Sequence, residues 1–358
     1  CTMTFKLPLL AAKEGRSDDT PSVLALFGVQ HPESLTPLKR NLIAALKDIF
    51  ALQNGPGHVQ IVLESRQPRN TSSNCNTTIF QTFWFSSTDY EAWWQSAAVS
   101  NFWNSLEEDA GIWREIMRIS PRRFMHATGS TKKQGLALVP ELADVDYADI
   151  APQQKYWGIY RERIPDHESD DFEIVVLRDP PSSSADTSID QIRLGRVVLS
   201  HGIDNMLYVW EFQDYSQMTE QEKEIWDKHI NAFVGGWMNS LDKERSKHGV
   251  LSFRNTASLT RIDDGLTSTS ESRITSQFVF YLDLAAFEYS GKSTRDHFKA
   301  RMAFEKHHKN SGALGMGKGR TQLSVEVGIL KKNDFEAEYI GCLEGTGTMG
   351  YKELIDAA

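Results

Sequence analysis

The stretch VLALFGVQ at residues 23–30 is a continuous apolar run of strand length, and the elements that follow it decide the fold. Residues 38–52 carry apolar side chains at every third or fourth position, which predicts a helix. Residues 58–63 and 78–85 indicate two further strands, and residues 89–103 are rich in aromatic residues at helical spacing. The order strand–helix–strand–strand–helix makes up much of a ferredoxin-like unit.

This order of elements recurs further along the chain, although the sequence itself does not repeat. The recurring elements are strands at 195–200 and 205–212, a long helix over 219–241, a strand at 277–284, a helix at His297 and a strand at 322–330. Two α+β units of similar order predict either a pseudo-duplicated barrel or a pair of sheets.

The domain organisation follows from these two units. We expect a tail at 1–22, a first half at 23–180 and a second half at 181–358. The Ser/Pro-rich segment 180–190 is expected to form an exposed loop between the halves.

Composition excludes some classes of partner. The 358 residues carry 39 basic and 48 acidic side chains, a net charge of −9 at pH 7, which makes nucleic acid and anionic membranes poor candidates. No apolar run is long enough for a membrane-spanning helix. Cys1, Cys75 and Cys342 form neither a zinc spacing nor a disulfide framework, so a reducing, cytoplasmic location is expected. The tryptophans at 84, 93, 94 and 103 fit either the wall of an apolar pocket or an ordinary core.

Residues 286–308 are interpreted as a loop, a capped helix start and an amphipathic helix. Ser293 suits an N-cap, and Asp296 lies where a capping-box acid would sit. His297 then falls in the first helical turn. It shares one face with Ala300, Arg301, Phe304 and His308. A histidine fixed there can hold a metal through one imidazole nitrogen, but an ordinary structural or surface histidine fits the same pattern.

The segment YWGIYRERIP at 156–165 is unusual because two arginines alternate with a glutamate. On an extended segment Arg161 and Arg163 would point to the same side. One of them is a candidate partner for a buried anion or hydroxyl group, and the alternative is a surface strip of ion pairs.

Several of these stretches together resemble the haem-containing aldoxime dehydratases. The resemblance runs from about residue 23 to the end, and the YWG-x-x-R-x-R piece with its spacing to the rest is its most specific part. The pieces that carry it are 23–30, 102–116 (FWNSLEEDAGIWREI), 156–165, 204–214 (DNMLYVWEFQD), the helix at His297 and 338–347 (EYIGCLEGTG).

The resemblance implies a fold, a reaction and a cofactor. The implied fold is an α+β, dimeric α/β-barrel of two ferredoxin-like halves with antiparallel sheets and surrounding helices, which agrees with the order of elements. The implied activity is that of a haem b-dependent lyase, which converts a small aldoxime to a nitrile. In that reaction the oxime nitrogen binds ferrous haem. The implied protein partner is a second copy of the chain, in a homodimer.

The resemblance also implies site residues. His297, within Asp296-His297-Phe298, matches the proximal haem ligand, and Arg163 matches the pocket arginine. Glu211 stands where some members carry a serine that helps to hold the substrate hydroxyl. A carboxylate of the family falls near Met125 or His126 in this sequence.

The departure from the family lies in the last predicted strand, where Val325 takes the position of a distal histidine. No histidine follows His308, so a small shift of the alignment does not restore one. Three alternatives remain open: Glu211 is the acid, Arg163 stabilises the leaving oxygen, or the haem protein acts on a different N–O or N–N substrate. A haem-free barrel that binds a small apolar ligand, or a purely structural dimer, also stays open.

Overall fold

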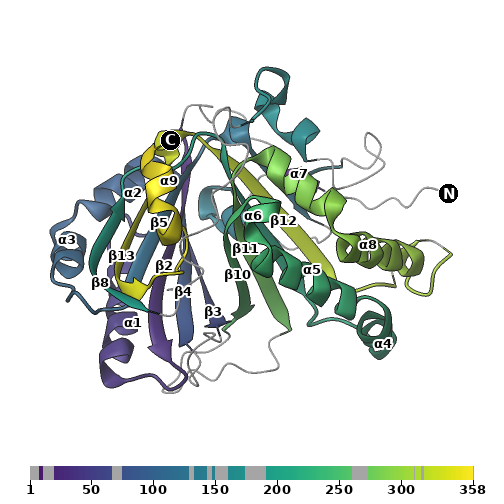
Figure 1. Cartoon of the computed structure of the whole chain (residues 1–358), viewed down its shortest axis with the longest axis horizontal. Helices are drawn as coiled ribbons and strands as arrows, with labels where there is room; N and C mark the ends of the chain where they lie inside the picture. Colours follow the sequence, from purple (N-terminus) through teal and green to yellow (C-terminus); the bar gives the residue numbers. More distant parts are fainter. Residues whose placement is uncertain are drawn as a thin grey trace.

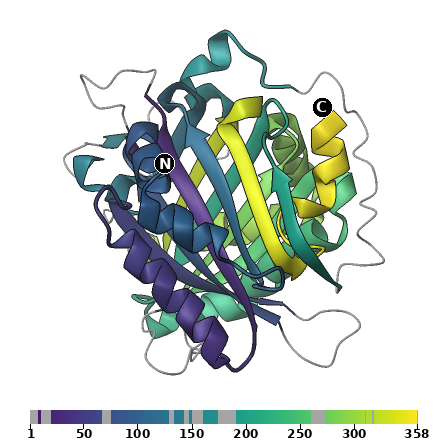
Figure 2. The same ribbon diagram turned by 90° about the vertical axis from the view of Figure 1, so that its left-hand side faces the viewer.

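The computed structural model describes residues 8–10, 20–66, 75–128, 133–142, 147–149, 160–173, 191–259, 273–309, 311–315 and 318–357. These residues form one 13-stranded antiparallel sheet in the order β7-β1-β6-β12-β9-β11-β10-β3-β4-β2-β5-β13-β8. The sheet curls into two leaves, each with helices on its outer face (Figures 1 and 2). The fold is therefore α+β, as predicted, and its strands form one curled sheet. The expected loop at 180–190 and most of the tail at 1–22 lie outside the described residues.

The first leaf is built around the stretch that opened the sequence. Its elements are β2 (Ser22–Pro32), α1 (Pro37–Phe50), β3 (His58–Arg66), β4 (Cys75–Trp84), α2 (Ser87–Trp94), α3 (Ala97–Asn104) and β5 (Ile112–Ile119). In space the strands run β3-β4-β2-β5. Helix α1 begins where Thr36 accepts a hydrogen bond from the Lys39 backbone N–H, with proline at the first helical position. The single helix predicted over 89–103 is instead two helices, and Ser96 occupies the N-cap position of the second.

The second leaf repeats this spatial order. Its elements are β9 (Met206–Asp214), α4 (Glu220–His229), α5 (Asn231–Lys243), α6 (Arg245–His248), β10 (Val250–Ser258), β11 (Ile274–Tyr281), α7 (Leu284–Ser293), α8 (Arg295–His308) and β12 (Gln322–Leu330). Its strands run β10-β11-β9-β12, so the first strand of each unit lies between the third and the fourth.

Each leaf is extended by a strand from the other part of the chain. The extending strands and the remaining elements are β1 (Pro8–Leu10), β6 (Phe124–Thr128), β7 (Tyr147–Asp149), β8 (Ile192–Leu199), β13 (Phe335–Leu343) and α9 (Lys352–Ala357). Strand β6 pairs with β12 of the second leaf, while the C-terminal β13 pairs with β5 of the first. The two leaves are thus interlocked through exchanged strands.

Alternation along the strands divides the core into three clusters. The first fills the space between the leaves and includes Trp113, Tyr208 and Trp210. The second lies under α1, α2 and α3, and contains the predicted aromatic group with Trp84, Trp93 and Trp103. The third, the helix-side cluster, lies under α5 and α7 and includes Leu207, Val209, Ile164, Phe172 and Val325. The aromatic group is therefore core beneath the first leaf and lies away from the helix-side cluster.

Two local predictions are wrong. Residues predicted to form a loop after 286 belong to α7, and the N-cap of α8 is Thr294 rather than Ser293. The long helix predicted over 219–241 is interrupted at Ile230, between α4 and α5. In the second case the apolar periodicity continues through the break, so spacing alone does not reveal it.

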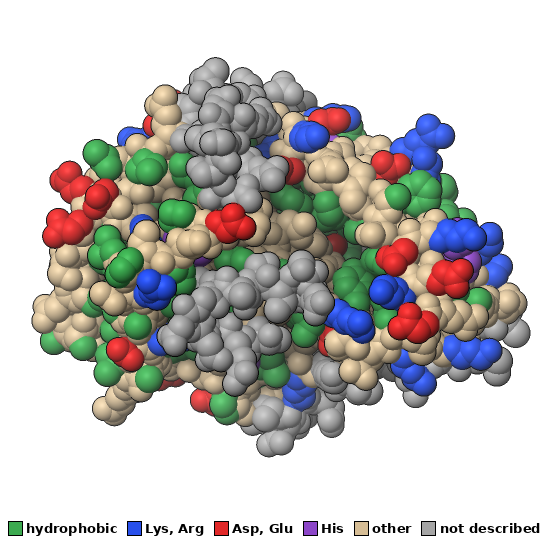
Figure 3. All heavy atoms as spheres, turned by 90° about the horizontal axis from the view of Figure 1, so that it is seen from below, with side chains coloured by type: hydrophobic (Ala, Val, Ile, Leu, Met, Phe, Trp, Pro, Cys, Tyr) green, Lys and Arg blue, Asp and Glu red, His purple; other side chains and the backbone are tan. Residues whose placement is uncertain are grey.

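Acidic and basic side chains are interspersed on the face seen in Figure 3. Within the described ranges, no helix has both the length and the apolar character needed to cross a membrane.

Candidate functional site

The central strand β9 places Glu211 on the helix-covered face of the second leaf. Glu211 stands in register with Val325 on β12 and with Gln277 on β11. Residues opposite one another in an antiparallel pair project to the same face. This face also carries Leu207 and Val209, and helices α5, α7 and α8 cover it (Figure 1).

Glu211 lies deep in the molecule, and burial raises the pKa of its carboxyl group to about 7. Its side chain nevertheless keeps intermediate solvent exposure. Tyr215 and Tyr281 have pKa values raised by burial and, to a lesser degree, by the Glu211 charge, so both hydroxyl groups remain protonated around it.

His297 occupies the first turn of α8 with its tautomer fixed. Its Nδ1 lies 2.6 Å from the backbone oxygen of Gly291, and a carbonyl can only accept, so Nδ1 carries the proton. Nε2 is therefore left with its lone pair. The ring centre is 4.4 Å from that of Trp237 on α5. Burial lowers the pKa of His297, opposed by the Gly291 bond and reinforced by Arg301, which keeps the imidazole neutral at pH 7.

Arg163 lies in a short 3₁₀ helix, Arg161–Arg163, and not on an extended segment. The two arginines therefore do not share a side, which corrects that prediction. Arg161 bonds to Glu288 of α7 at 3.3 Å, whereas Arg163 is buried and burial lowers its pKa. The next residue, Ile164, belongs to the helix-side cluster. Residues 156–159, which include the YWG piece, lie outside the described residues.

The two positions near the expected family carboxylate face opposite ways. Met125 belongs to the helix-side cluster, with Val327 as its register partner. His126 points between the leaves, where its Nδ1 lies 3.0 Å from Oε1 of Glu326. The helix-covered face thus has an apolar residue at each of positions 125 and 325, and Glu211 supplies the carboxyl group.

Sequence reasoning missed a row of amides beside Glu211. Gln277 accepts a hydrogen bond from Gln213 at 2.6 Å and donates one to Asn255 at 2.9 Å, while Thr275 donates to Gln213 at 3.0 Å. The signal was the two polar residues at 275 and 277, which lie at alternate positions along β11. Assigning these residues to the site required the register of β11 against β9, because only strand pairing shows that they share the face of Glu211.

Residues 25–348 match the model of the haem-containing dehydratases. The chain belongs to this family. The predicted haem cofactor and the predicted class of enzyme, a hydro-lyase, are therefore confirmed at the level of the family.

Curated relatives agree across most of the chain. An aliphatic aldoxime dehydratase of Rhodococcus globerulus is 25% identical over 94% of this chain and 89% of its own length. A phenylacetaldoxime dehydratase of Bacillus sp. (strain OxB-1) is 22% identical over 93% and 89%. A crystal structure of an aldoxime dehydratase with butyraldoxime superimposes with a TM-score of 0.72 at 20% identity, covering 98% of this chain and 95% of that one. That likeness shows that the fold is shared.

The residues present fit a haem group. One neutral imidazole, fixed by a carbonyl at Nδ1 and open at Nε2, is the usual form of an axial histidine ligand. Part of the helix-covered face, at Leu207, Val209 and Val325, is apolar and would suit a macrocycle. In the part of the chain that the structure describes, no three His, Cys, Asp or Glu residues group to hold a bare ion. A single histidine donor suits iron that is held in a macrocycle.

Proposed function

We propose that this chain is a haem b-dependent lyase that dehydrates aldoximes to nitriles, with Glu211 as the proton donor in place of the family's distal histidine. The observation that carries the proposal is a carboxyl group with a pKa of about 7, in register with Val325 on the helix-covered face. The aldoxime dehydratases among the relatives supply the substrate class.

His297 would hold the haem iron through Nε2, as its fixed Nδ1 proton allows. When bound, ferrous haem supplies a binding point for the oxime nitrogen and electron density for N–O cleavage. Glu211 in its acid form gives its proton to the departing hydroxyl group, which leaves as water. The carboxylate then takes the proton from the aldoxime C–H, so the nitrile forms and Glu211 returns to its acid form.

Arg163 would hold the oxime oxygen as a hydrogen-bond donor that keeps its own proton. Its burial favours this role, because a guanidinium group shielded from water attracts developing negative charge more strongly. Val325 cannot donate, and its contribution would be an apolar wall beside the haem.

The finer features of the fold belong to the same proposal. The shared strand order of the two leaves supports ferredoxin-like halves, with the division at 180/181. The exposed apolar row Ile192, Leu194 and Val198 on the edge strand β8 supports a homodimer. The reducing, cytoplasmic location stays a prediction from cysteine usage.

Val325 favours one alternative, a haem enzyme of the same fold that acts on a different N–O or N–N substrate. Without a histidine on β12, the site lacks the imidazole proton donor that the resemblance implies. A substrate that needs no distal imidazole would suit such a site.

The visible spectrum of the dithionite-reduced protein, before and after addition of butyraldoxime, tests the proposal. We expect a Soret band of a histidine-ligated ferrous haem, a shift with the aldoxime, and butyronitrile in the product. A Soret band without nitrile would favour the alternative substrate. A protein that stays colourless with added hemin would instead indicate a haem-free barrel.

A further inference from the structure

Residues 160–173, here called the strap, connect the helices of the second leaf to its sheet. On the helix side, the Tyr160 ring lies 5.1 Å from that of Phe287, and Arg161 bonds to Glu288, both on α7. On the sheet side, the strap reaches residues that adjoin β6, β9 and β12. Arg163 lies between these two attachments.

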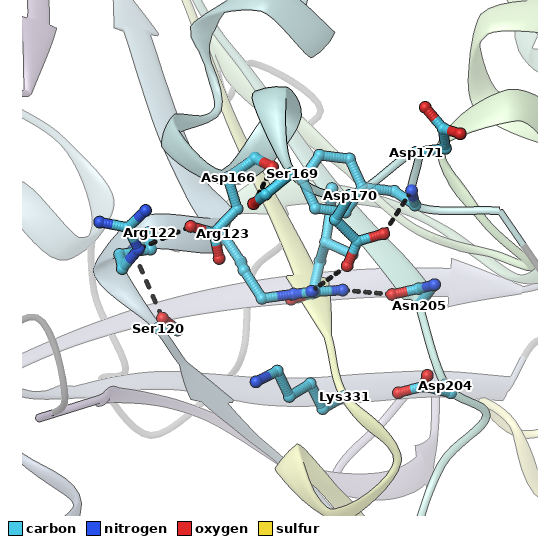
Figure 4. A network of polar contacts seen from close by, with 12 residues as sticks. Ser120, Arg122, Arg123, Asp166, Ser169, Asp170, Asp171, Asp204, Asn205 and Lys331 are labelled. Carbon is cyan, nitrogen blue, oxygen red and sulfur yellow. Dashed lines mark hydrogen bonds and ion pairs between the residues drawn. The ribbon is translucent and has the colours of Figure 1, made fainter.

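The sheet-side attachment is centred on Arg123, which is 4% exposed and ends the 3₁₀ helix Pro121–Arg123 before β6 (Figure 4). Its Nη1 donates to Asp170 Oδ2 at 2.7 Å, and its Nε donates to the Ile329 carbonyl at 3.3 Å. Its Nη2 donates to the side-chain oxygen of Asn205, just before β9. One guanidinium group therefore joins the strap to two strands of the sheet.

Asp170 uses its second oxygen to hold an unusual backbone conformation. The Phe172 N–H donates to Asp170 Oδ1 at 2.8 Å, and Phe172 has a φ of 55°, a region that bulky residues rarely adopt. Its fully buried ring packs in the helix-side cluster and lies 4.9 Å from the Arg123 guanidinium carbon. Such a conformation persists only where its surroundings hold it, and here Arg123 and Asp170 do so.

The strap between Asp170 and Arg163 is built as a rigid unit. Consecutive backbone hydrogen bonds join Arg163 to Tyr160, Ile164 to Arg161, His167 to Ile164 and Asp170 to Asp166, at 3.0–3.1 Å. The His167 ring adds a bond of 2.8 Å to the Ile164 carbonyl. A displacement at Asp170 is therefore passed along the strap to Arg163 rather than absorbed between them.

We infer that Arg123 is a positioning residue for Arg163, acting through Asp170 and the strained turn at Phe172. The inference deepens the proposed function and rests on it, because Arg163 is there the donor to the oxime oxygen. Arg123 faces the sheet and touches neither substrate nor cofactor in this assignment. Its effect is to set where the Arg163 guanidinium stands relative to Glu211 and His297.

Arg122 provides a matched control. It is the neighbouring residue and bonds to Asp166 of the same strap at 2.6 Å, but its side chain is 48% exposed. An exposed pair contributes little to holding a geometry, whereas a buried arginine with several bonds contributes much. Arg122→Gln and Arg123→Gln therefore remove the same chemical group from adjacent positions, and they differ in burial and bonding.

Backbone amide hydrogen exchange of the purified protein tests positioning without any reaction. We expect Arg123→Gln and the milder Asp170→Asn to speed exchange at 163–172, and Arg122→Gln to leave it as in the wild type. Arg123→Lys keeps the charge and should restore part of the protection. Wild-type exchange in both Arg123→Gln and Asp170→Asn would overturn the inference, whether or not nitrile is made.

A double-mutant cycle then tests the link to Arg163. We expect Arg123→Gln to keep the haem content of the wild type and to lower kcat/KM for butyraldoxime about 100-fold, the loss that misplacement by an ångström can cause. The double variant Arg123→Gln/Arg163→Gln should be no slower than Arg163→Gln alone. Additive losses would show that Arg123 acts on stability and not through Arg163. An absence of nitrile from the wild type would count against the proposed function only. The same double-mutant cycle is then measured on the affinity for butyraldoxime, which is determined from the shift of the Soret band.

Discussion

Positions 211 and 325 have to be considered together, because they are register partners on adjacent strands. The resemblance to the family implies a histidine acid at the position of Val325, and an ordinary histidine has a pKa of about 6.5. Here the β12 position is apolar, and burial brings the carboxyl group on β9 to a pKa of about 7. A donor of comparable acidity thus stands one strand away. Valine at position 325, where the resemblance implies a histidine, is therefore compatible with acid catalysis, provided that Glu211 stays desolvated.

Glu211→Gln tests this acid directly. In the wild type only the protonated carboxyl group donates, so kcat should fall as pH rises through the Glu211 pKa of about 7. The variant should lose roughly 10²- to 10⁴-fold in kcat and lose that pH dependence. Tyr215 and Tyr281 remain protonated over this range and cannot mimic the effect. Adding Val325→His to Glu211→Gln should recover part of the rate, and an unaltered rate and pH profile in Glu211→Gln would contradict the assignment.

His297→Ala should abolish the Soret band, because Nε2 of this residue is the proposed haem ligand. Absorption spectra of the variant purified and reconstituted with hemin measure this. His229→Ala removes an exposed histidine from α4 and should keep the band. An unchanged Soret band in His297→Ala would transfer the ligand role to another residue.

Helix α8 carries His297, and both of its ends are attached to neighbouring elements. At the start, the Thr294 hydroxyl donates to the Ser290 carbonyl of α7 at 2.7 Å. At the end, His308 Nε2 lies 3.8 Å from Glu222 of α4. The same Glu222 carboxylate accepts from the backbone N–H groups of Arg320 and Thr321, just before β12. One buried carboxylate thus joins the helix of the proposed ligand to the strand of Val325.

Glu222→Gln is expected to lower the free energy of unfolding by about 1.5–3 kcal/mol, the usual contribution of hydrogen bonds to a charged group. Urea unfolding at pH 7 measures this. Burial opposes the shift, but the nearby His308 and hydrogen bonds from Thr321 and Arg320 lower the Glu222 pKa from 4.5 to about 2. The carboxylate therefore stabilises the fold fully above about pH 4.5, and this contribution is lost as pH falls towards 2.

Glu224→Gln, on the exposed side of the same helix, is the control and should change stability by less than about 0.5 kcal/mol. If Glu222→Gln unfolds like this control, the attachment of α8 through Glu222 contributes nothing measurable.

At the scale of the whole molecule, the two leaves are joined by a buried ion pair. Arg254 of β10 forms two bonds to Glu115 of β5, at 2.7 and 2.8 Å, with side chains 3% and 0% exposed. The Tyr339 hydroxyl of β13 donates to the same carboxylate at 2.6 Å. Strands β10 and β5 are separated in the sheet order by β3, β4 and β2, so this contact crosses the interior.

Arg254→Met should destabilise the protein by about 3–5 kcal/mol, because it leaves the Glu115 charge buried without a cation. Chemical denaturation of the purified protein measures the loss. Replacing both partners, as in Glu115→Leu/Arg254→Met, should recover much of it. Arg245→Ala removes an exposed pair with Asp242 and should cost no more than about 1 kcal/mol. A loss in Arg254→Met as small as in this control would show that the interior pair is not a main attachment between the leaves.

Apolar periodicity identifies elements in which apolar residues form a continuous run or recur at the helical or strand spacing. It predicts β2, β4, β9, β12 and α1 to within a few residues. It does not identify β5 or β13, because their charged side chains are buried against one another and against the other leaf. Arg114 of β5, for example, bonds to Glu336 and Glu338 of β13. Without the partner strand, such residues are typical of an exposed or irregular segment.

The sequence by itself determined the order of many of the elements, the family and the place of His297 in the first turn of a helix, because these depend on local spacing and on motifs. The tertiary structure decided which face of the sheet Glu211 and Val325 share, and that Arg163 is buried while Arg161 is paired with α7. It also decided the acidity of Glu211 and the attachment of the strap through Arg123. These properties arise from strand register and from burial, and both are set by residues distant in the chain.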